Sequence, residues 1–321
     1  MDKPFLSFDK QIDKLIKEYN LIIQNRDFAY ESLTSISYYD LINGYQSIYR
    51  SGDKYLPGTT MEQLVATHIF NKNIQGVIMK FSTYAENSYK NILANVIAEK
   101  FTEDQNEYLK IINYKRSRDA NQRAKLKELL QKLLNYCNSC NDTPTLHYRL
   151  SKDHIPPWIL FRNISFSDTA DLFIYLNKND KEYLMSFFSM LNTKNLNYDD
   201  KVTIMVDSLK YVRKIRNRIA HNLDFMTYRS CTLDKSANSL FTDTLILSNE
   251  KNKYKHDIWG MVLATIILLN NKYIIQNFLA EINSFLKQGG ILTDIYCNIT
   301  GIPHDYETRI IKHIDVLGLS Q

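Results

Sequence analysis

Glycine, proline and cysteine are scarce in this sequence of 321 residues. It has nine glycines and six prolines, and because both residues interrupt regular structure, their scarcity favours long helices over a fold rich in strands and turns. The four cysteines do not form the pattern of a disulfide framework; they are Cys137, Cys140, Cys231 and Cys297. We therefore expect an all-α protein that does not depend on disulfide bonds.

Apolar runs are also short. The longest, from Ile258 to Leu269, has twelve residues, whereas a helix needs about 20 to cross a bilayer. We expect this run to be a buried core helix. The beginning of the chain has no apolar run behind its charges, so no signal peptide is predicted. These absences predict a cytoplasmic protein that does not associate with a membrane.

Cofactor and metal motifs are missing. No Gly-rich phosphate loop, dinucleotide fingerprint or zinc-protease helix motif occurs, so we expect no cofactor. Cys137 and Cys140, followed by His147 and His154, are zinc-binding residue types, but there is one Cys pair and the histidines are widely spaced. We expect no metal site. The net charge of +5, from 40 basic and 35 acidic residues, permits a nucleic-acid partner without requiring one.

Capping residues predict where the first helices begin. Ser7 and Asn25 can cap two of the three short helices expected over residues 7–49, and a loop follows over 50–60. Thr60 and Gln63 form a capping box that opens a long helix up to residue 100, with a kink near 73–76. Residues 1–60 would form an N-terminal helical extension. Residues 61–321 would form the main helical domain, with inserted helices and a C-terminal tail.

Apolar periodicity predicts further helices in the remainder of the chain. We expect them over 104–138, 158–163, 168–177 (capped by Ser167), 181–191, 199–221, 256–288 and 305–314, with loops over 138–157 and 223–255. Residues 242–247 have the composition of a short strand, and Gly289-Gly290 would end the helix over 256–288. We expect His256, His304 and His313 to be surface or capping residues.

The stretch from Tyr211 to Asn222 concentrates the residues that can carry chemistry. Its cations are Arg213, Lys214, Arg216 and Arg218, and it also holds Asn217 and His221. Val212, Ile215 and Ile219 share one helical face, so the stretch is predicted to be the end of a helix that is apolar on one side and basic on the other. Asn222 is a plausible terminator, because Asn tolerates the left-handed conformation.

Arg216, Asn217 and His221 are the residues that RNA cleavage without a metal needs. A His exchanges protons near neutral pH, and an Arg fork holds the phosphate and meets its growing charge. Asn217 and His221 are four residues apart and within reach of each other, but Arg216 and His221 are about 140° apart on a regular helix. The helix loosens at His221, or Arg216 reaches round, or a second subunit completes the site.

Structural explanations compete with functional ones along the chain. A basic helix end with one His is common and by itself weak evidence of a nuclease. The tyrosines Tyr38, Tyr39 and Tyr45 could present a surface for RNA bases or a partner, but core packing is the favoured interpretation. A basic group that consists of Lys115, Arg116, Arg118 and Arg123 could bind RNA or be a solvated helix face.

Several segments resemble known families. Arg216-Asn217-x-x-x-His221 after a long helix resembles the signature of the HEPN superfamily. The segment from Ile36 to Tyr45 resembles one near the start of the Abi-like family, of the AbiD/AbiF abortive-infection type. Further matches to that family are Lys3-Pro4, Gln11-Ile12, Pro157-Trp158-Ile159-Leu160 and Ile164-Ser165-Phe166-Ser167, in which Ser167 replaces the usual Gly. The resemblance covers residues 3 to about 225.

This resemblance implies a HEPN-type up-and-down helical bundle and a metal-independent endoribonuclease that acts in phage defence or as the toxin of a toxin–antitoxin pair. His221 would be the general acid or base, Arg216 would hold the phosphate, and Asn217 would orient His221 or the phosphate. Glu86 would be a carboxylate that orients Arg216 or His221, although an exposed salt bridge with Lys90 is the alternative.

The resemblance also implies partners. An RNA substrate would be gripped by Arg213, Lys214 and Arg218, an antitoxin or regulatory RNA would restrain the protein, and a homodimer would pair two motifs. The rival function is a non-catalytic helical protein that binds RNA or a protein partner. A third possibility is a structural immunity component that needs a separate effector.

Overall fold

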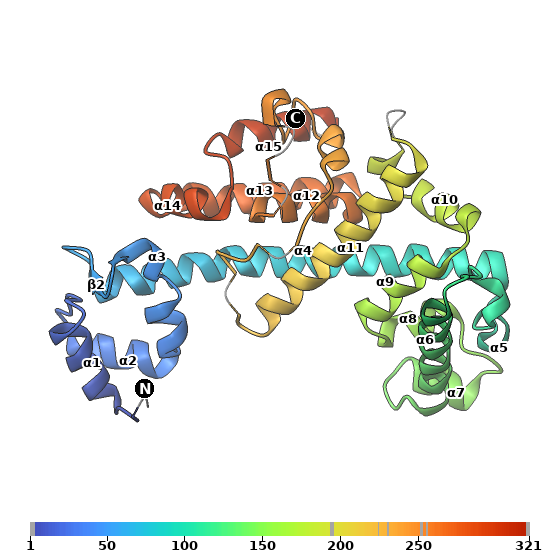
Figure 1. Ribbon diagram of the computed structural model, residues 1–321, viewed down its shortest axis with the longest axis horizontal. Coiled ribbons are helices and arrows are strands. Elements are labelled where there is room, and N and C mark those ends of the chain that lie inside the picture. Colours follow the sequence, from blue (N-terminus) through green and yellow to red (C-terminus); the bar gives the residue numbers. More distant parts are fainter. Residues whose placement is uncertain are drawn as a thin grey trace.

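The fold is built around one long helix, α4 (Met61–Phe101), which the other helices surround (Figure 1). The computed structural model describes residues 4–192, 196–223, 225–229, 231–250, 253–254 and 256–318. Within them the expected all-α class is confirmed, with a single small antiparallel sheet of β1 (Arg50–Ser51) and β2 (Lys54–Tyr55). No helix in the described part of the chain is long and apolar enough to cross a membrane.

Helix α4 begins at the predicted capping box. The Thr60 hydroxyl accepts a hydrogen bond from the Gln63 backbone N–H at 3.2 Å, and the Gln63 side chain accepts one from the Thr60 N–H at 3.0 Å. The helix then continues for 41 residues, about 60 Å. The helix is continuous through residues 73–76, where a kink was expected, and Ile74, Val77 and Ile78 are buried there.

The N-terminal segment packs at one end of α4 (Figure 1). Its helices are α1 (Phe8–Lys17), α2 (Arg26–Ser35), the π-helical turn η1 (Tyr39–Asn43) and α3 (Gln46–Tyr49). Ser7 and Asn25 cap the first two helices as expected. Hydrogen bonds between Tyr45 and His68 and between Tyr49 and Thr67 join the segment to α4.

The middle segment, at the other end of α4, is more broken than expected. It consists of α5 (Gln105–Tyr108), η2 (Ile111–Asn113), α6 (Ala120–Ser139), α7 (Thr145–Ser151), α8 (Pro157–Asn163), α9 (Phe166–Tyr175), α10 (Lys178–Ser186) and η3 (Ser189–Leu191). A single helix over 104–138 was the wrong expectation, because Asp119 caps a new helix by accepting from the Asn121 N–H. The predicted loop over 138–157 contains α7. Ser165, not Ser167, caps α9.

Helix α11 (Tyr198–Ala220) crosses both α4 and α12 (Ile258–Leu269). It starts behind Asn197, with Asp199 and Asp200 in the first turn, where their charge favours the helix N-terminus. Buried side chains hold it in place, at Ile204, Leu209, Val212 and Ile215. The Tyr211 hydroxyl donates to the Asp257 carbonyl at 2.7 Å. The end of α11 is therefore fixed relative to the core.

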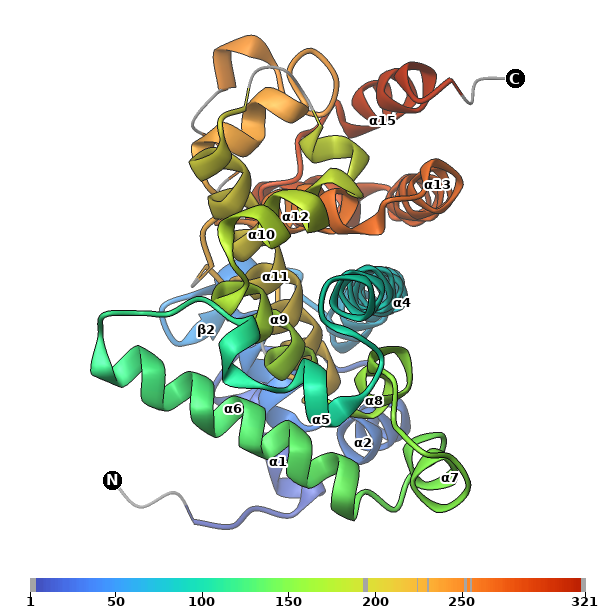
Figure 2. The ribbon, with the colours of Figure 1, turned by 90° about the vertical axis from the view of Figure 1, so that its right-hand side faces the viewer.

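The C-terminal segment lies along the other side of α4 (Figure 2). The expected helix over 256–288 is two helices, α12 and α13 (Lys272–Gln288), because Asn270 adopts φ 40°, in the left-handed region. Every residue of α12 is buried, which confirms the predicted core helix. Two further helices follow, α14 (Ile291–Thr300), which was not expected, and α15 (Tyr306–Val316).

In its described residues, the segment between α11 and α12 contains the 3₁₀ turns η4 (Lys235–Leu240) and η5 (Ser248–Glu250). The strand considered for 242–247 does not form; Thr242 and Ile246 make one isolated bridge instead. His313 is buried against Thr244 rather than at the surface, and burial lowers the pKa of its imidazole to about 4.

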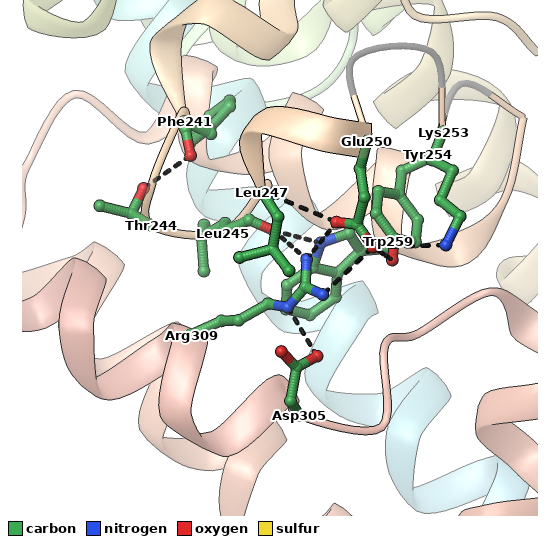
Figure 3. A network of polar contacts seen from close by, with 10 residues as sticks. All are labelled: Phe241, Thr244, Leu245, Leu247, Glu250, Lys253, Tyr254, Trp259, Asp305 and Arg309. Atoms are coloured by element: carbon green, nitrogen blue, oxygen red, sulfur yellow. Dashed lines mark hydrogen bonds and ion pairs between the residues drawn. The ribbon is translucent and has the colours of Figure 1, made fainter.

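A buried ion-pair network fastens this segment to α15 (Figure 3). The Arg309 guanidinium donates to Glu250 at 2.6 Å and to Asp305 at 2.7 Å. Glu250 also accepts hydrogen bonds from the Tyr254 hydroxyl and the Leu247 N–H. Burial alone would raise the pKa of Glu250, but these hydrogen bonds and the Arg309 charge lower it to about 2.

Glu250→Gln is expected to destabilise the protein at neutral pH by about 3 kcal/mol, because it leaves the buried Arg309 with the half-exposed Asp305 as its remaining carboxylate partner. The pKa of Glu250 is depressed on folding from 4.5 to about 2, so its contribution is present above about pH 4.5 and is lost as the pH falls towards 2. Urea unfolding at a series of pH values should therefore show that the free energy of unfolding falls less steeply towards acid pH in the variant than in the wild-type protein. Equal pH dependence in both proteins would contradict this assignment.

Candidate functional site

The end of α11 departs from helical geometry at His221. Its backbone angles are φ −95° and ψ 11°, and Asn222 follows at φ 55°, in the left-handed conformation expected of a terminator. The Leu223 N–H then donates to the Arg218 carbonyl at 2.9 Å, which satisfies one of the last carbonyls of the helix. Three explanations were considered for how Arg216 and His221 could act together despite their angular separation. The structure shows one of them, a helix that loosens at His221.

Arg216 is held by a carboxylate of α4. Its Nη2 lies 3.4 Å from Glu86 Oε2, and the other oxygen of Glu86 lies 2.7 Å from Lys90 Nζ. Glu86 and Lys90 are both buried, so the alternative of an exposed surface salt bridge was wrong. The interpretation in which Glu86 orients Arg216 is the one that agrees with these contacts.

The buried charge of Lys90 has partners within the protein. Lys90 Nζ also donates to the Ile164 carbonyl at 2.8 Å, so the ammonium has an anion and a carbonyl in place of water. Glu86 faces two cations. The Nε of Arg216 is buried and without a hydrogen-bond partner in the described residues, but 33% of the side chain is exposed. A guanidinium that is fixed on one side and open on the other can receive a phosphate.

Asn217 and His221 occupy the solvent side of the same helix end. The Asn217 side-chain oxygen accepts a hydrogen bond from Arg216 Nη1 at 3.3 Å. His221 is exposed, and it makes no hydrogen bond or ion pair with Arg216. The structure therefore brings Glu86, Arg216 and Asn217 into contact and leaves the imidazole free to meet a ligand.

A clamp on the residue after His221 was not predicted. Asn222 Nδ2 donates to Asp40 Oδ2 at 2.7 Å, and Lys72 Nζ donates to Asn222 Oδ1. Burial lowers the pKa of Lys72, and the Asp40 carboxylate opposes this effect. A Cβ at Gly44 would lie 2.3 Å from the Asp40 carbonyl oxygen, so only glycine fits there. Nothing in sequence spacing relates residues 40, 72 and 222.

A cavity beside this clamp has a volume of about 40 Å³. It lies between the N-terminal segment, α4 and the residues that follow α11; Asp40, Lys72 and Asn222 are among its lining residues. A cavity of this size has room for water but not for a nucleotide. The clamp is therefore better suited to positioning the end of α11 than to binding substrate.

The other cations of α11 already have contacts within the protein. Arg213 Nη1 donates to the Ser167 hydroxyl at 2.6 Å, so the residue that replaces the usual Gly fixes this guanidinium. Arg218 stacks over the Tyr228 ring at 4.2 Å. Lys214 is half-buried. They lie around the same helix end as Arg216, and their contact with RNA remains a prediction.

The second basic group is separate from this site. Lys115, Arg116 and Arg118 precede α6 and are exposed, while Arg123 in its first turns donates to the Ser117 and Arg118 carbonyls. The Lys115 N–H donates to the Tyr175 carbonyl at the end of α9. Arg213 contacts Ser167 near the start of the same helix. Residues 167 and 175 are roughly 12 Å apart along the helix axis. Both interpretations of this group, RNA surface and solvated face, stay open.

The tyrosine cluster and the cysteines are mainly structural. Tyr45 is buried and Tyr38 is half-buried, in agreement with core packing, although 69% of Tyr39 is exposed. Cys137 and Cys140 are buried free thiols. Among the described residues, no group of His, Cys, Asp or Glu could hold a metal ion.

Fold and site together define an all-α protein whose basic, histidine-bearing helix end is held by a carboxylate of its central helix. Residues 31–226, more than half of the chain, match the family described as Abi-like protein, and the chain belongs to that family. Membership suggests a part in abortive infection, the bacterial defence against phage. No curated protein and no solved structure matches the chain.

Glu86→Gln is expected to cost about 3 kcal/mol of stability, because Lys90 then remains buried without an anion. The double variant Glu86→Gln/Lys90→Met should recover much of that loss. Chemical denaturation measures both. A matched control is Glu18→Gln, which breaks the exposed i,i+4 pair with Lys14 and should change stability by less than about 1 kcal/mol. Equal effects of Glu86→Gln and Glu18→Gln would contradict the burial argument.

Proposed function

We propose that this protein is a metal-independent endoribonuclease of the HEPN type that acts in abortive infection. The observation that carries the proposal is the pairing of Arg216 with buried Glu86, next to an exposed His221 at the same helix end. The carboxylate fixes the guanidinium before substrate arrives, and such preorganisation is the main way in which protein groups stabilise a developing charge. The resemblance of Arg216-Asn217-x-x-x-His221 to the HEPN signature supports the same conclusion.

The chemistry follows from the two side chains. Arg216 binds the scissile phosphate, and His221, as general base, takes the proton of the ribose 2′-hydroxyl. The 2′-oxygen forms a bond to phosphorus while the bond from phosphorus to the 5′-oxygen breaks. The 5′-oxygen takes up a proton and leaves. The products end in a cyclic 2′,3′-phosphate and a 5′-hydroxyl. Asn217, bonded to Arg216, keeps the guanidinium oriented.

Two proton transfers need two proton-transfer groups, and each chain contributes one His221. A homodimer that pairs two copies of the helix end supplies both. An RNA substrate is the partner that this chemistry requires. An antitoxin or regulatory RNA that restrains the enzyme stays a prediction from the family resemblance.

RNA cleavage in EDTA is the central test. The wild-type protein is expected to cut single-stranded RNA without added metal and to leave cyclic phosphate ends, which mass spectrometry identifies. His221→Ala should lower the rate by at least about 100-fold, since general acid–base catalysis contributes that much or more. Arg216→Ala should have a comparable effect, whereas His304→Ala, which removes another exposed imidazole, should have none.

The alternative function, RNA binding without catalysis, has one observation in its favour: Arg216 and His221 are not in contact with each other. It gives a different result in the same experiment. Tight RNA binding by the wild-type protein with no cleavage would support this alternative, and loss of cleavage in His221→Ala with retained binding would support the nuclease.

Light scattering after size-exclusion chromatography tests the dimer. We expect a mass of twice 37.7 kDa at the concentrations at which RNA is cut, because a monomer carries one His221. A strict monomer, both free and with bound RNA, would remove the second histidine from the mechanism while leaving the cleavage experiment to decide the activity.

A further inference from the structure

We propose that the cleft between α4 and α8 binds one base of single-stranded RNA beside the phosphate held by Arg216. The inference rests on the proposed function and adds a substrate subsite to it. The cleft has a volume of about 340 Å³, at the lower end of the range for small-molecule sites. Its lining residues are Asn87, Lys90, Asn91, Trp158, Phe161 and Arg162.

Trp158 supplies the stacking surface. It stands in the first turn of α8, where Pro157 at the first helical position fixes the backbone. The side chain is 46% exposed, and its indole N–H has no hydrogen-bond partner among the described residues. The other tryptophan, Trp259, is fully buried, and its N–H donates to the Leu245 carbonyl. An exposed aromatic face in a cleft is the platform on which unpaired RNA bases stack.

Polar groups surround this platform. Asn87 and Asn91 are exposed and one helical turn apart on α4, and each carboxamide offers both a donor and an acceptor to the edge of a base. Exposed Arg162 adds a cation from α8. Lys90 donates to Glu86 and to the Ile164 carbonyl, so two of its three hydrogens are used and one remains for a ligand.

The cleft adjoins the proposed catalytic cation. Lys90 belongs to its wall, and the same Glu86 carboxylate that binds Lys90 at 2.7 Å pairs with Arg216 at 3.4 Å. One carboxylate therefore contacts both the guanidinium and a residue of the cleft wall. The proposal places the phosphate on Arg216 and the base of an adjacent nucleotide on Trp158.

Tryptophan fluorescence measures this contact directly, because Trp158 is the exposed one of the two tryptophans. The ligand is a short single-stranded RNA with 2′-O-methyl groups, which has no free hydroxyl to attack and is not cut. A second oligonucleotide of equal length and charge lacks bases. We expect the first to quench the fluorescence of the full-length protein, and to bind roughly 10-fold more tightly than the abasic one, the effect of one stacked base.

Substitutions of Trp158 test whether the base-dependent binding and the quenching come from the cleft. Trp158→Ala should bind the base-bearing RNA roughly 10-fold more weakly and bind the abasic RNA as the wild-type protein does. Trp158→Phe should keep most of the affinity and lose the quenching. Tyr273→Ala removes an exposed aromatic residue of α13 and should change neither. Circular dichroism confirms that the variants are folded.

The outcomes separate the subsite from the nuclease. Equal affinity of wild-type protein and Trp158→Ala for the base-bearing RNA, or no quenching on binding, would overturn the subsite even if RNA is cleaved in EDTA. Base-dependent quenching that Trp158→Ala abolishes would support the subsite even if the wild-type protein cuts no RNA, and in that case the proposed nuclease activity alone would fail.

Discussion

The buried carboxylate of Glu86 is the interaction that joins the end of α11 to the central helix at the candidate site. It lies within the helical core and faces two cations, Lys90 of its own helix and Arg216 of α11. A buried anion is costly unless it is paired, so this contact favours the observed crossing of α11 over α4. The ammonium of Lys90 is in turn tied to the Ile164 carbonyl, which brings the start of α9 to the same point. The Glu86 carboxylate therefore contributes both to helix packing and to the candidate site.

Segments far apart in sequence meet at the end of α11. Asp40 from the N-terminal segment and Lys72 from α4 hold Asn222, immediately after His221. The expected division between an N-terminal extension and a main domain at residue 60 is thus crossed by contacts that position the candidate site. The match to the Abi-like family begins at residue 31 and ends at 226, and so spans both sides of this clamp.

Local signals in the sequence predicted the elements well where the deciding interactions are themselves local. The capping box at Thr60, the end of α11 at Asn222 and the burial of α12 all depend on neighbouring residues or on an unbroken apolar run. The breaks at Asp119 and Asn270 were not predicted, because the apolar pattern continues across both positions. Asp119 caps a new helix, and Asn270 ends α12 in the left-handed conformation.

The sequence by itself determined the helical class and the set of chemical groups in the stretch that ends at His221, because composition and helical period are local properties. Tertiary structure decided which of those groups act together. An i,i+4 pair of Glu86 and Lys90 is the same in sequence whether it is exposed or buried. The packing of α4 against α8 and α11 buries this pair and adds Arg216, and the cleft in front of Trp158 lies between α4 and α8.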